Sequence, residues 1–447
     1  MTVLAFVLGV LILALGLGIS IALHEIGHLV PAKLFGVRVT QYMIGFGPTI
    51  FSRTRGETEY GLKAIPLGGY IRMIGMFPPH KGDPEGTVRE DSTGFLQQMS
   101  NDAKEWEATQ YGPDELHRTF SALSVPKKLV VMLGGPTMNL LISIVLMAIM
   151  VTGVGLPAVT PKVASVSECV VPADAPPDTS CEGRPEAPAL AAGIRPDDLL
   201  VSIDGHDIRT WADVTTAVRA AGDREVPVVV ERNGKQITLR ATPIVDARPV
   251  LDDQGNVVRE ADGTIRTEQV GFLGVAGTPD LVPASPAVVP QMAWDAFVGT
   301  ARIIVTLPVR LIDVAKAAFG PGERDPNGPI GVVGVSRLAG EIASAEEPGF
   351  ELKQKTGTML SVLASLNMAL FVFNLVPLMP LDGGHVAGAL VEGARRFIAR
   401  LRGRPDPGPV DMSKLLPLTN AVAVLLLVMT VLLVYADIVK PVTLFGG

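Results

Sequence analysis

The sequence predicts a polytopic α-helical membrane protein with four transmembrane helices and a β-rich domain inserted between the second and the third. Three observations support this fold class. Apolar residues make up 48% of the 447 residues and charged residues only 19%, whereas ordinary soluble domains carry about 25% charged residues. Four uncharged runs are long enough to cross a hydrocarbon core of about 30 Å. Residues 190–275 instead show short β-branched runs separated by glycine turns.

Composition also excludes several classes of protein. The net charge of −7 argues against a nucleic-acid binder, which needs a basic face. Two cysteines are too few for a disulfide-rich scaffold, and the apolar content excludes a disordered chain.

The four apolar runs differ in their expected regularity. The first has no basic residue before it and leads directly into His24, so it is interpreted as a retained helix and not as a cleaved signal peptide. In the second, Gly134-Gly135-Pro136 should unwind the first part. The third contains Pro377 and Pro380 near its end, and the fourth is uninterrupted. The runs cover residues 2–23, 129–154, 359–381 and 415–436.

The distribution of basic residues predicts the orientation in the membrane. Twelve Lys and Arg residues lie between spans one and two, and the short loop between spans three and four is also rich in arginine. Positive-inside counting places both loops in the cytoplasm. Both termini and the large segment 155–357 are then extracytoplasmic.

The outer segment opens with a Pro- and Ala-rich stretch, 157–188, that is expected to be strand and loop. It contains Cys169 and Cys181, for which the alternatives are two free thiols or a disulfide. In an oxidising compartment a disulfide here would contribute about 3 kcal/mol in the chain-entropy model. We expect the disulfide. A zinc site at this pair is not expected, because no histidine or further cysteine lies nearby.

A small β-rich domain follows. We expect a strand at 201–203, a helix at 211–221, and strands at 228–230 and 237–239 around an Asn233-Gly234 turn. An inserted hairpin should precede a last strand at 270–275. Segment 293–319 is apolar but is interrupted by Arg302, Arg310, Asp313 and Lys316, so it should not span the membrane. It is either a surface-lying amphipathic helix or a helix packed on the β-rich domain.

The strongest chemical signal is His24-Glu25-Ile-Gly-His28. Residues i and i+4 of a helix share one face, so both imidazoles can reach one metal ion while Glu25 acts on a water molecule. Zn²⁺ suits this set of ligands. Ionisable groups at the end of an apolar span are costly and usually mark function. The alternative is a pair of interfacial histidines beside a solvated glutamate.

Two histidines leave a catalytic zinc ion one protein ligand short. The candidate third ligand is Asp382, at the end of the third apolar run. Prolines should break the helix there, and the following glycines should permit a tight turn that aims Asp382 inward. His385 lies close by; we interpret it as a supporting residue, because Asp382 sits nearer the end of the helix.

These two motifs, in this order and at the ends of apolar spans, resemble the site-2 protease family of intramembrane zinc metalloproteases, specifically the bacterial branch with an extracytoplasmic PDZ module. The motifs that carry the resemblance are His24-Glu25-x-x-His28 and Asn374-x-x-Pro377-x-x-Pro380-Leu-Asp382-Gly383, with Gly134-Gly135-Pro136-x-x-Asn139 in the second span. The resemblance implies that His24, His28 and Asp382 bind one Zn²⁺ ion, that Glu25 is the base and that Asn374 contacts the substrate.

The resemblance extends to two further regions. Residues 190–245 resemble a protease-type PDZ domain, and residues 45–70 resemble the membrane-associated β-hairpin of the family, with a turn at 55–57 and Gly68-Gly69 near the substrate. The implied organisation is as follows: 1–36, first span; 37–127, cytoplasmic segment with the hairpin; 128–155, second span; 156–278, PDZ-like domain; 279–356, linker with an amphipathic helix; 357–383, third span; 384–414, basic cytoplasmic loop; and 415–447, fourth span and tail.

The implied activity is hydrolysis of single-span membrane proteins after a first extracytoplasmic cut by a site-1 protease. The resemblance implies anti-sigma factors or remnant signal peptides as substrates, with peptide binding or size exclusion at the PDZ-like domain and no nucleic-acid partner. Two other functions compete with this one. A receptor or scaffold with structural zinc would normally supply four protein ligands, and three are found. A transporter would favour inverted repeats, and none is found.

Overall fold

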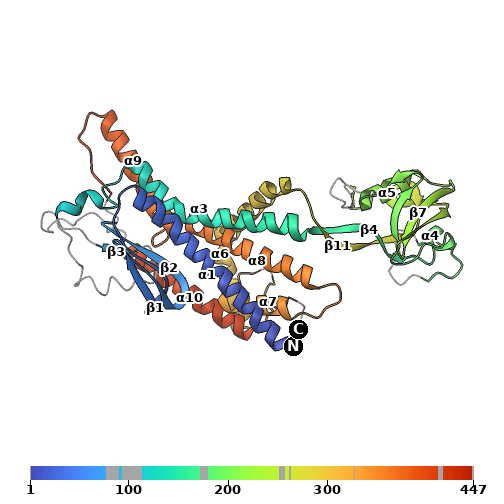
Figure 1. Cartoon of the computed structure of the whole chain (residues 1–447), viewed down its shortest axis with the longest axis horizontal. Coiled ribbons are helices and arrows are strands. Elements are labelled where there is room, and N and C mark those ends of the chain that lie inside the picture. The colour runs from blue at the N-terminus through green and yellow to red at the C-terminus, as the bar shows by residue number, and fades with distance from the viewer. Residues whose placement is uncertain are drawn as a thin grey trace. The chain divides into compact units, whose positions relative to one another are not determined.

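The protein is described by a computed structural model that covers residues 2–76, 90–92, 113–171, 180–250, 257–260, 263–326, 328–410 and 416–444. The chain forms two compact units (Figure 1). The first, unit 1, combines Met1–Val154 with Ser285–Gly447, and the second, unit 2, is Gly155–Ala284.

Unit 1 is built on long apolar helices. Within the described residues, four helices are long and apolar enough to cross a membrane, which confirms the four predicted spans. They are α1 (Thr2–Leu34), α3 (Val125–Ile149, continued by the π-helix η3, Met150–Val154), α8 (Leu352–Asn374) and α10 (Leu416–Val439). Figure 1 shows α1 and α3 crossing near one end of the unit.

The crossing of α1 and α3 corrects the expectation that Gly134-Gly135-Pro136 unwinds the second span. Helix α3 continues through Pro136. The glycines serve close packing instead: a Cβ atom added at Gly27 would lie 2.3 Å from the Gly134 carbonyl oxygen, and one at Gly134 would lie 2.0 Å from the Gly27 carbonyl oxygen. Two helix backbones approach this closely only where neither residue carries a side chain.

Polar side chains also join the spans. The Asn367 amide donates to the Ser20 hydroxyl at 3.0 Å, linking α8 to α1. The Ser143 hydroxyl of α3 donates to the Ala364 carbonyl of α8 at 2.8 Å. In an apolar surrounding such hydrogen bonds fix the rotation of one helix against the next.

Among the described residues of unit 1 there are three further α-helices, namely α6 (Val289–Phe319), α7 (Val332–Ser344) and α9 (Asp382–Leu401). Helix α6 is not among the four candidate spans, and its residues Val314 and Ala318 pack on α10. It therefore contacts helices of its own unit. Segment 384–414 was expected to be a loop. Its first 18 residues are helical instead and belong to α9.

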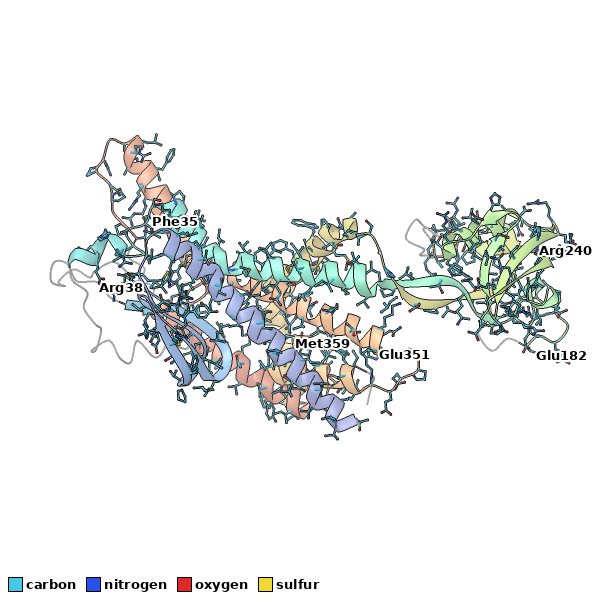
Figure 2. The ribbon with its side chains drawn as sticks, viewed as in Figure 1. Phe35, Arg38, Glu182, Arg240, Glu351 and Met359 are labelled. Carbon is cyan, nitrogen blue, oxygen red and sulfur yellow. A yellow bond between two sulfur atoms is a disulfide. The ribbon has the colours of Figure 1, made fainter. Side chains whose placement is uncertain are left out.

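A sheet lies at one end of α1, beside Phe35 and Arg38 (Figure 2). Strands β1 (Val39–Arg55), β2 (Thr58–Ile74) and β3 (Glu90–Ser92) are antiparallel, with the predicted turn between β1 and β2. The expected hairpin is longer than predicted and folds back on itself. Segment 59–62 pairs with 41–44 on one side and with 51–54 on the other, so it is bonded on both sides.

Unit 2 is a β-rich domain, and its described residues include two short α-helices. Its larger sheet has the order β11-β4-β5-β7-β8, with β6 beside β5. The predicted helix and the predicted Asn233-Gly234 turn are present. The elements are β4 (Leu156–Val166), α4 (Pro188–Ala191), β5 (Leu199–Ile203), β6 (His206–Asp207), α5 (Trp211–Ala220), β7 (Val226–Arg232), β8 (Lys235–Ala241), β9 (Ile244–Pro249), β10 (Thr267–Phe272) and β11 (Val275–Val282).

The last predicted strand of this domain, 270–275, is instead the junction of two strands. The chain leaves β10 after Phe272, and β11 continues to Val282, because Gly274 has φ +84° and breaks the strand. Strand β10 pairs with β9, and residues 251–256 and 261–262, which lie between these strands in the expected hairpin, are outside the described residues. Cys169 and Cys181 form a disulfide with Cα atoms 5.6 Å apart.

Candidate metal centre and active site

Three side chains from the two ends of the chain meet at one point. His24 and His28 lie one turn apart on α1, and Asp382 is the first residue of α9. The two imidazole Nε2 atoms are 3.2 Å apart, and each lies 3.3 Å from Asp382 Oδ2. Among the described residues this is the one group of three or more His, Cys, Asp and Glu side chains close enough to hold a metal ion.

The size of this triangle fits a zinc ion. Zinc binds His nitrogen and carboxylate oxygen at about 2.0–2.1 Å in tetrahedral geometry. The edge of such a tetrahedron is about 3.3 Å, and the three donor atoms are separated by 3.2, 3.3 and 3.3 Å. Three protein donors leave the fourth corner for water or substrate, as in catalytic sites.

The orientation of His28 is set by α3. Its Nδ1 atom lies 2.8 Å from the Val131 carbonyl oxygen, which can only accept, so Nδ1 carries the proton and the neutral ring leaves Nε2 free to bind metal. Gly135 lies against the same ring: a Cβ atom added there would be 2.2 Å from His28 Nε2. Sequence reasoning missed both contacts, although Gly135 was part of a singled-out motif.

Asp382 is delivered by the break between α8 and α9. Helix α8 ends at Asn374, and α9 begins at Asp382 after an irregular stretch that contains both prolines. The following glycines do not form the expected tight turn, because both are helical. They allow close approach instead: a Cβ atom at Gly383 would lie 2.2 Å from the Val376 carbonyl oxygen, so only glycine lets α9 fold back onto this stretch.

The structure places the other predicted residues as follows. Asn374 is the half-buried last residue of α8. His385 is buried one turn after Asp382 and lines a cavity of about 30 Å³ with Lys128 and Glu392. It is not a member of the three-residue group.

Glu25 lies between the metal ligands on α1 and is 5% exposed. Strand β2 passes directly beside it, since a Cβ atom added at Gly69 would lie 2.9 Å from Glu25 Cγ. Gly68 precedes Gly69 in β2, has φ +107° and lies against the Phe46 ring. The backbone of β2 therefore runs past the glutamate with no side chain between them.

Tyr42 of β1 links the sheet to α1 close to Glu25. Its hydroxyl donates to the Ala22 carbonyl at 2.9 Å, one turn before the glutamate. Burial, together with the negative charge of Glu25, raises the pKa of Tyr42 to about 12, so the hydroxyl keeps its proton at neutral pH. No sequence pattern singled out this residue, because a tyrosine in a strand is usually a packing residue.

Comparison with known proteins agrees with this geometry. The sequence profile of Peptidase family M50 matches residues 12–404. Zinc metalloprotease Rip1 of Mycobacterium tuberculosis is 33% identical over 457 residues, covering 98% of this chain and 99% of the relative. The protein of the same name in Mycolicibacterium smegmatis is 32% identical with the same coverage. Zinc metalloprotease RasP of Geobacillus kaustophilus is 25% identical and covers 85% of this chain and 88% of the relative.

The match extends over most of the chain and includes His24, His28 and Asp382, which carry the three donor atoms. The chain belongs to peptidase family M50, the site-2 protease family, and is a membrane zinc metalloendopeptidase.

Proposed function

We propose that this enzyme hydrolyses peptide bonds within or near the transmembrane segments of single-span membrane proteins, with His24, His28 and Asp382 as the zinc ligands and Glu25 as the base. The observation that carries the proposal is the triangle of donor atoms with edges of 3.2–3.3 Å, placed where an apolar span ends. A soluble protease has no need to build its metal site from membrane-spanning helices.

The proposed chemistry assigns one role to each group. Bound zinc supplies Lewis acidity, which activates water near pH 7 and polarises a carbonyl group. Glu25, held beside the ligands on the same helix, takes a proton from the attacking water and passes it to the leaving nitrogen. Val131 and Gly135 keep the His28 ring in place through the contacts described above.

We further propose that the extended substrate lies along β2 at Gly68-Gly69. A transmembrane helix hides its peptide bonds in internal hydrogen bonds, and a strand backbone offers replacement bonds. The bare backbone of β2 beside Glu25 supports this position. Strand segment 59–62 is a poor candidate, since both of its sides are already bonded. Exposed Ile50 and Phe51 near the hairpin turn support its contact with the membrane.

The decisive experiment on the base compares Glu25→Gln with Glu347→Gln, a change at an exposed glutamate, in purified full-length enzyme. Zinc content should stay near that of wild type in both variants, because neither residue is a ligand. Cleavage of a model single-span substrate should be lost only in Glu25→Gln. Cleavage by that variant at a rate near wild type would contradict the assignment of the base.

The natural substrates are proposed to be anti-sigma factors or remnant signal peptides already cut by a site-1 protease. The distribution of basic residues supports an active site near the cytoplasm, with unit 2 and both termini proposed to lie outside. Membrane proteomes of wild-type and Glu25→Gln cells should differ in trimmed single-span proteins, which accumulate only in the mutant. Accumulation of full-length proteins alone would contradict a role after a first cut.

Unit 2 is proposed to be a PDZ-like domain that restricts access by untrimmed substrates. Its first and last strands pair side by side, Leu156 opposite Val282, so the domain can be excised by joining residue 154 to residue 285. The excised enzyme should keep its zinc and cut untrimmed substrates that the intact enzyme refuses. Retained zinc with no cleavage of any substrate would show that the domain is needed to present substrate.

A further inference from the structure

Helix α9 has two faces of opposite character. One face is buried and carries Asp382, His385 and Glu392 among small residues. The other is apolar and exposed: five large residues on it are 46 to 71% exposed, namely Leu390, Val391, Phe397, Ile398 and Leu401. Positions seven, eight and eleven residues apart return to one side of a helix, so these five form a continuous stripe, which we call the outer stripe.

The outer stripe is flanked by arginines that form no ion pair within the described part of the chain. Four exposed arginines lie along and just after it, namely Arg395, Arg400, Arg402 and Arg404. The two nearby acidic residues are already paired, since both Glu392 and Asp406 contact Arg396. The surface that α9 presents is therefore apolar along its centre and basic at its flanks.

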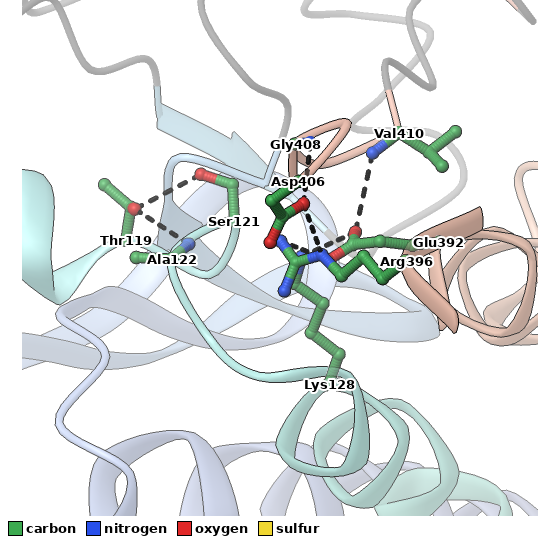
Figure 3. A network of polar contacts seen from close by, with 9 residues as sticks. All are labelled: Thr119, Ser121, Ala122, Lys128, Glu392, Arg396, Asp406, Gly408 and Val410. Carbon is green, nitrogen blue, oxygen red and sulfur yellow. Dashed lines mark hydrogen bonds and ion pairs between the residues drawn. The ribbon is translucent and has the colours of Figure 1, made fainter. Parts of the chain in front are cut away.

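A buried ion pair fixes which face of α9 turns outward. The Lys128 ammonium of α3 lies 2.8 and 3.0 Å from the two carboxylate oxygens of Glu392, and both side chains are buried. The Val410 backbone and the Arg396 guanidinium contact the same carboxylate (Figure 3). Rotating α9 would leave a buried charge without a partner, which is strongly unfavourable.

The same pair places the outer stripe at the edge of the membrane. Lys128 immediately precedes the uncharged run 129–154 of α3, so Glu392 and the neighbouring Leu390 lie at the boundary of the apolar span. The distal half of α9 continues from that boundary, where lipid headgroups begin. A helix with an apolar stripe and basic flanks at this depth is the pattern of an interfacial helix.

We propose that the outer stripe of α9 binds an anionic lipid surface, with its apolar side chains among the acyl chains and Arg395, Arg400, Arg402 and Arg404 on the headgroups. The occupant is a lipid surface and not a protein, because α9 follows one membrane span, α8, and precedes another, α10, along the chain, and its charge complements anionic headgroups. Helix α9 is then held between α3 on one face and lipid on the other. The proposal does not depend on the catalytic assignments.

Immersion of the stripe can be measured with single spin labels. The two native cysteines form a disulfide, so an introduced cysteine is labelled alone. Full-length Phe397→Cys and Leu401→Cys proteins would be labelled and reconstituted into vesicles of phosphatidylcholine with or without phosphatidylglycerol. The control is Ile237→Cys, an exposed apolar position of unit 2. Collision rates with oxygen and with a water-soluble nickel chelate report the depth of each label.

In vesicles containing phosphatidylglycerol, labels at 397 and 401 should be reached by oxygen and protected from the nickel chelate, and the label at 237 should not be protected. Each Arg→Gln change among the four arginines should lower the ratio of immersed to exposed label about fivefold, and high salt should act in the same direction. Labels as accessible to nickel as that at 237 would overturn the proposal and leave the stripe for a protein partner. Equal immersion without phosphatidylglycerol would overturn the preference for anionic lipid.

Discussion

The contact between Gly135 and His28 provides the sharpest test of the metal centre. In Gly135→Ala the new Cβ atom would lie 2.2 Å from His28 Nε2 and 2.7 Å from two ring carbons. Real Cβ atoms do not approach closer than 3.0 Å, so the ring or the helix must move by at least 0.8 Å. The His28 ring is fully buried, and the glycine contact between α1 and α3 prevents the helices from sliding closer.

A shift of this size is large for a zinc ligand, whose bond lengths vary by only about 0.2 Å. Loss of a supporting contact to a ligand already costs about 10- to 100-fold in metal affinity, so we expect at least a tenfold loss of zinc affinity in Gly135→Ala. Overpacking should also destabilise the fold by about 1–3 kcal/mol. The matched control is Gly153→Ala, because a Cβ atom at Gly153 meets nothing within 4 Å.

Zinc affinity would be measured by chelator competition in purified protein, alongside size-exclusion and thermal unfolding profiles. The control variant should match wild type in every measurement. A folded Gly135→Ala protein that binds zinc as tightly as wild type would refute the geometric reasoning. Equal losses of zinc in both glycine variants would show a general effect of helix substitution.

Three further predictions concern other charged groups. Asp382→Asn should lose at least tenfold in zinc affinity by chelator competition, and full retention would move the third ligand elsewhere, with His385 the first alternative. Lys128→Met leaves the buried Glu392 carboxylate with weaker partners and should lower the free energy of unfolding by about 3 kcal/mol, whereas the double variant with Glu392→Leu should recover most of this stability. In unit 2, hydrogen bonds from Arg232 hold the pKa of Asp198 below its usual value. The resulting stability is complete above the unfolded pKa of about 3.9 and is lost as pH falls through the lower folded value. The protection of unit 2 against hydrogen exchange, taken relative to the intrinsic exchange rate at each pH, should therefore fall in acid for wild type, and Asp198→Asn should lack that acid-dependent part.

The sequence was sufficient to predict the helical membrane elements and the three side chains that meet in a group able to hold a metal ion. Uncharged runs of more than twenty residues have one stable structure in a bilayer, a helix, so the four spans could be predicted. Their ends were less predictable, because α1 continues through Glu25 and His28 to Leu34 and α8 begins seven residues before its apolar run. Charged residues at span ends are tolerated, and hydropathy alone does not mark where the helix stops.

Helix α9 was missed for a related reason. Its buried face contains Gly383, Gly384 and Gly388, residues that lower intrinsic helix propensity and suggested a loop. Tertiary packing decides the outcome instead: Gly384 lies too close to Met379 for any side chain, and the Lys128–Glu392 pair holds the middle of the helix against α3. The second contact joins residues 264 positions apart, so it cannot be inferred from the local sequence.

The metal centre shows where local reasoning ends. The i, i+4 spacing fixes His24 and His28 on one face of a helix, but no spacing relates them to Asp382, which lies 354 positions after His28. What closes the triangle is backbone proximity: Gly27 against Gly134, Gly135 against the His28 ring, and Gly383 against Val376. The glycines carry no donor atom, yet they set the distances between donors. It follows that substitutions at Gly135 and Gly383 should change zinc affinity more than substitutions at glycines with open space around them, even where the loss of fold stability is the same.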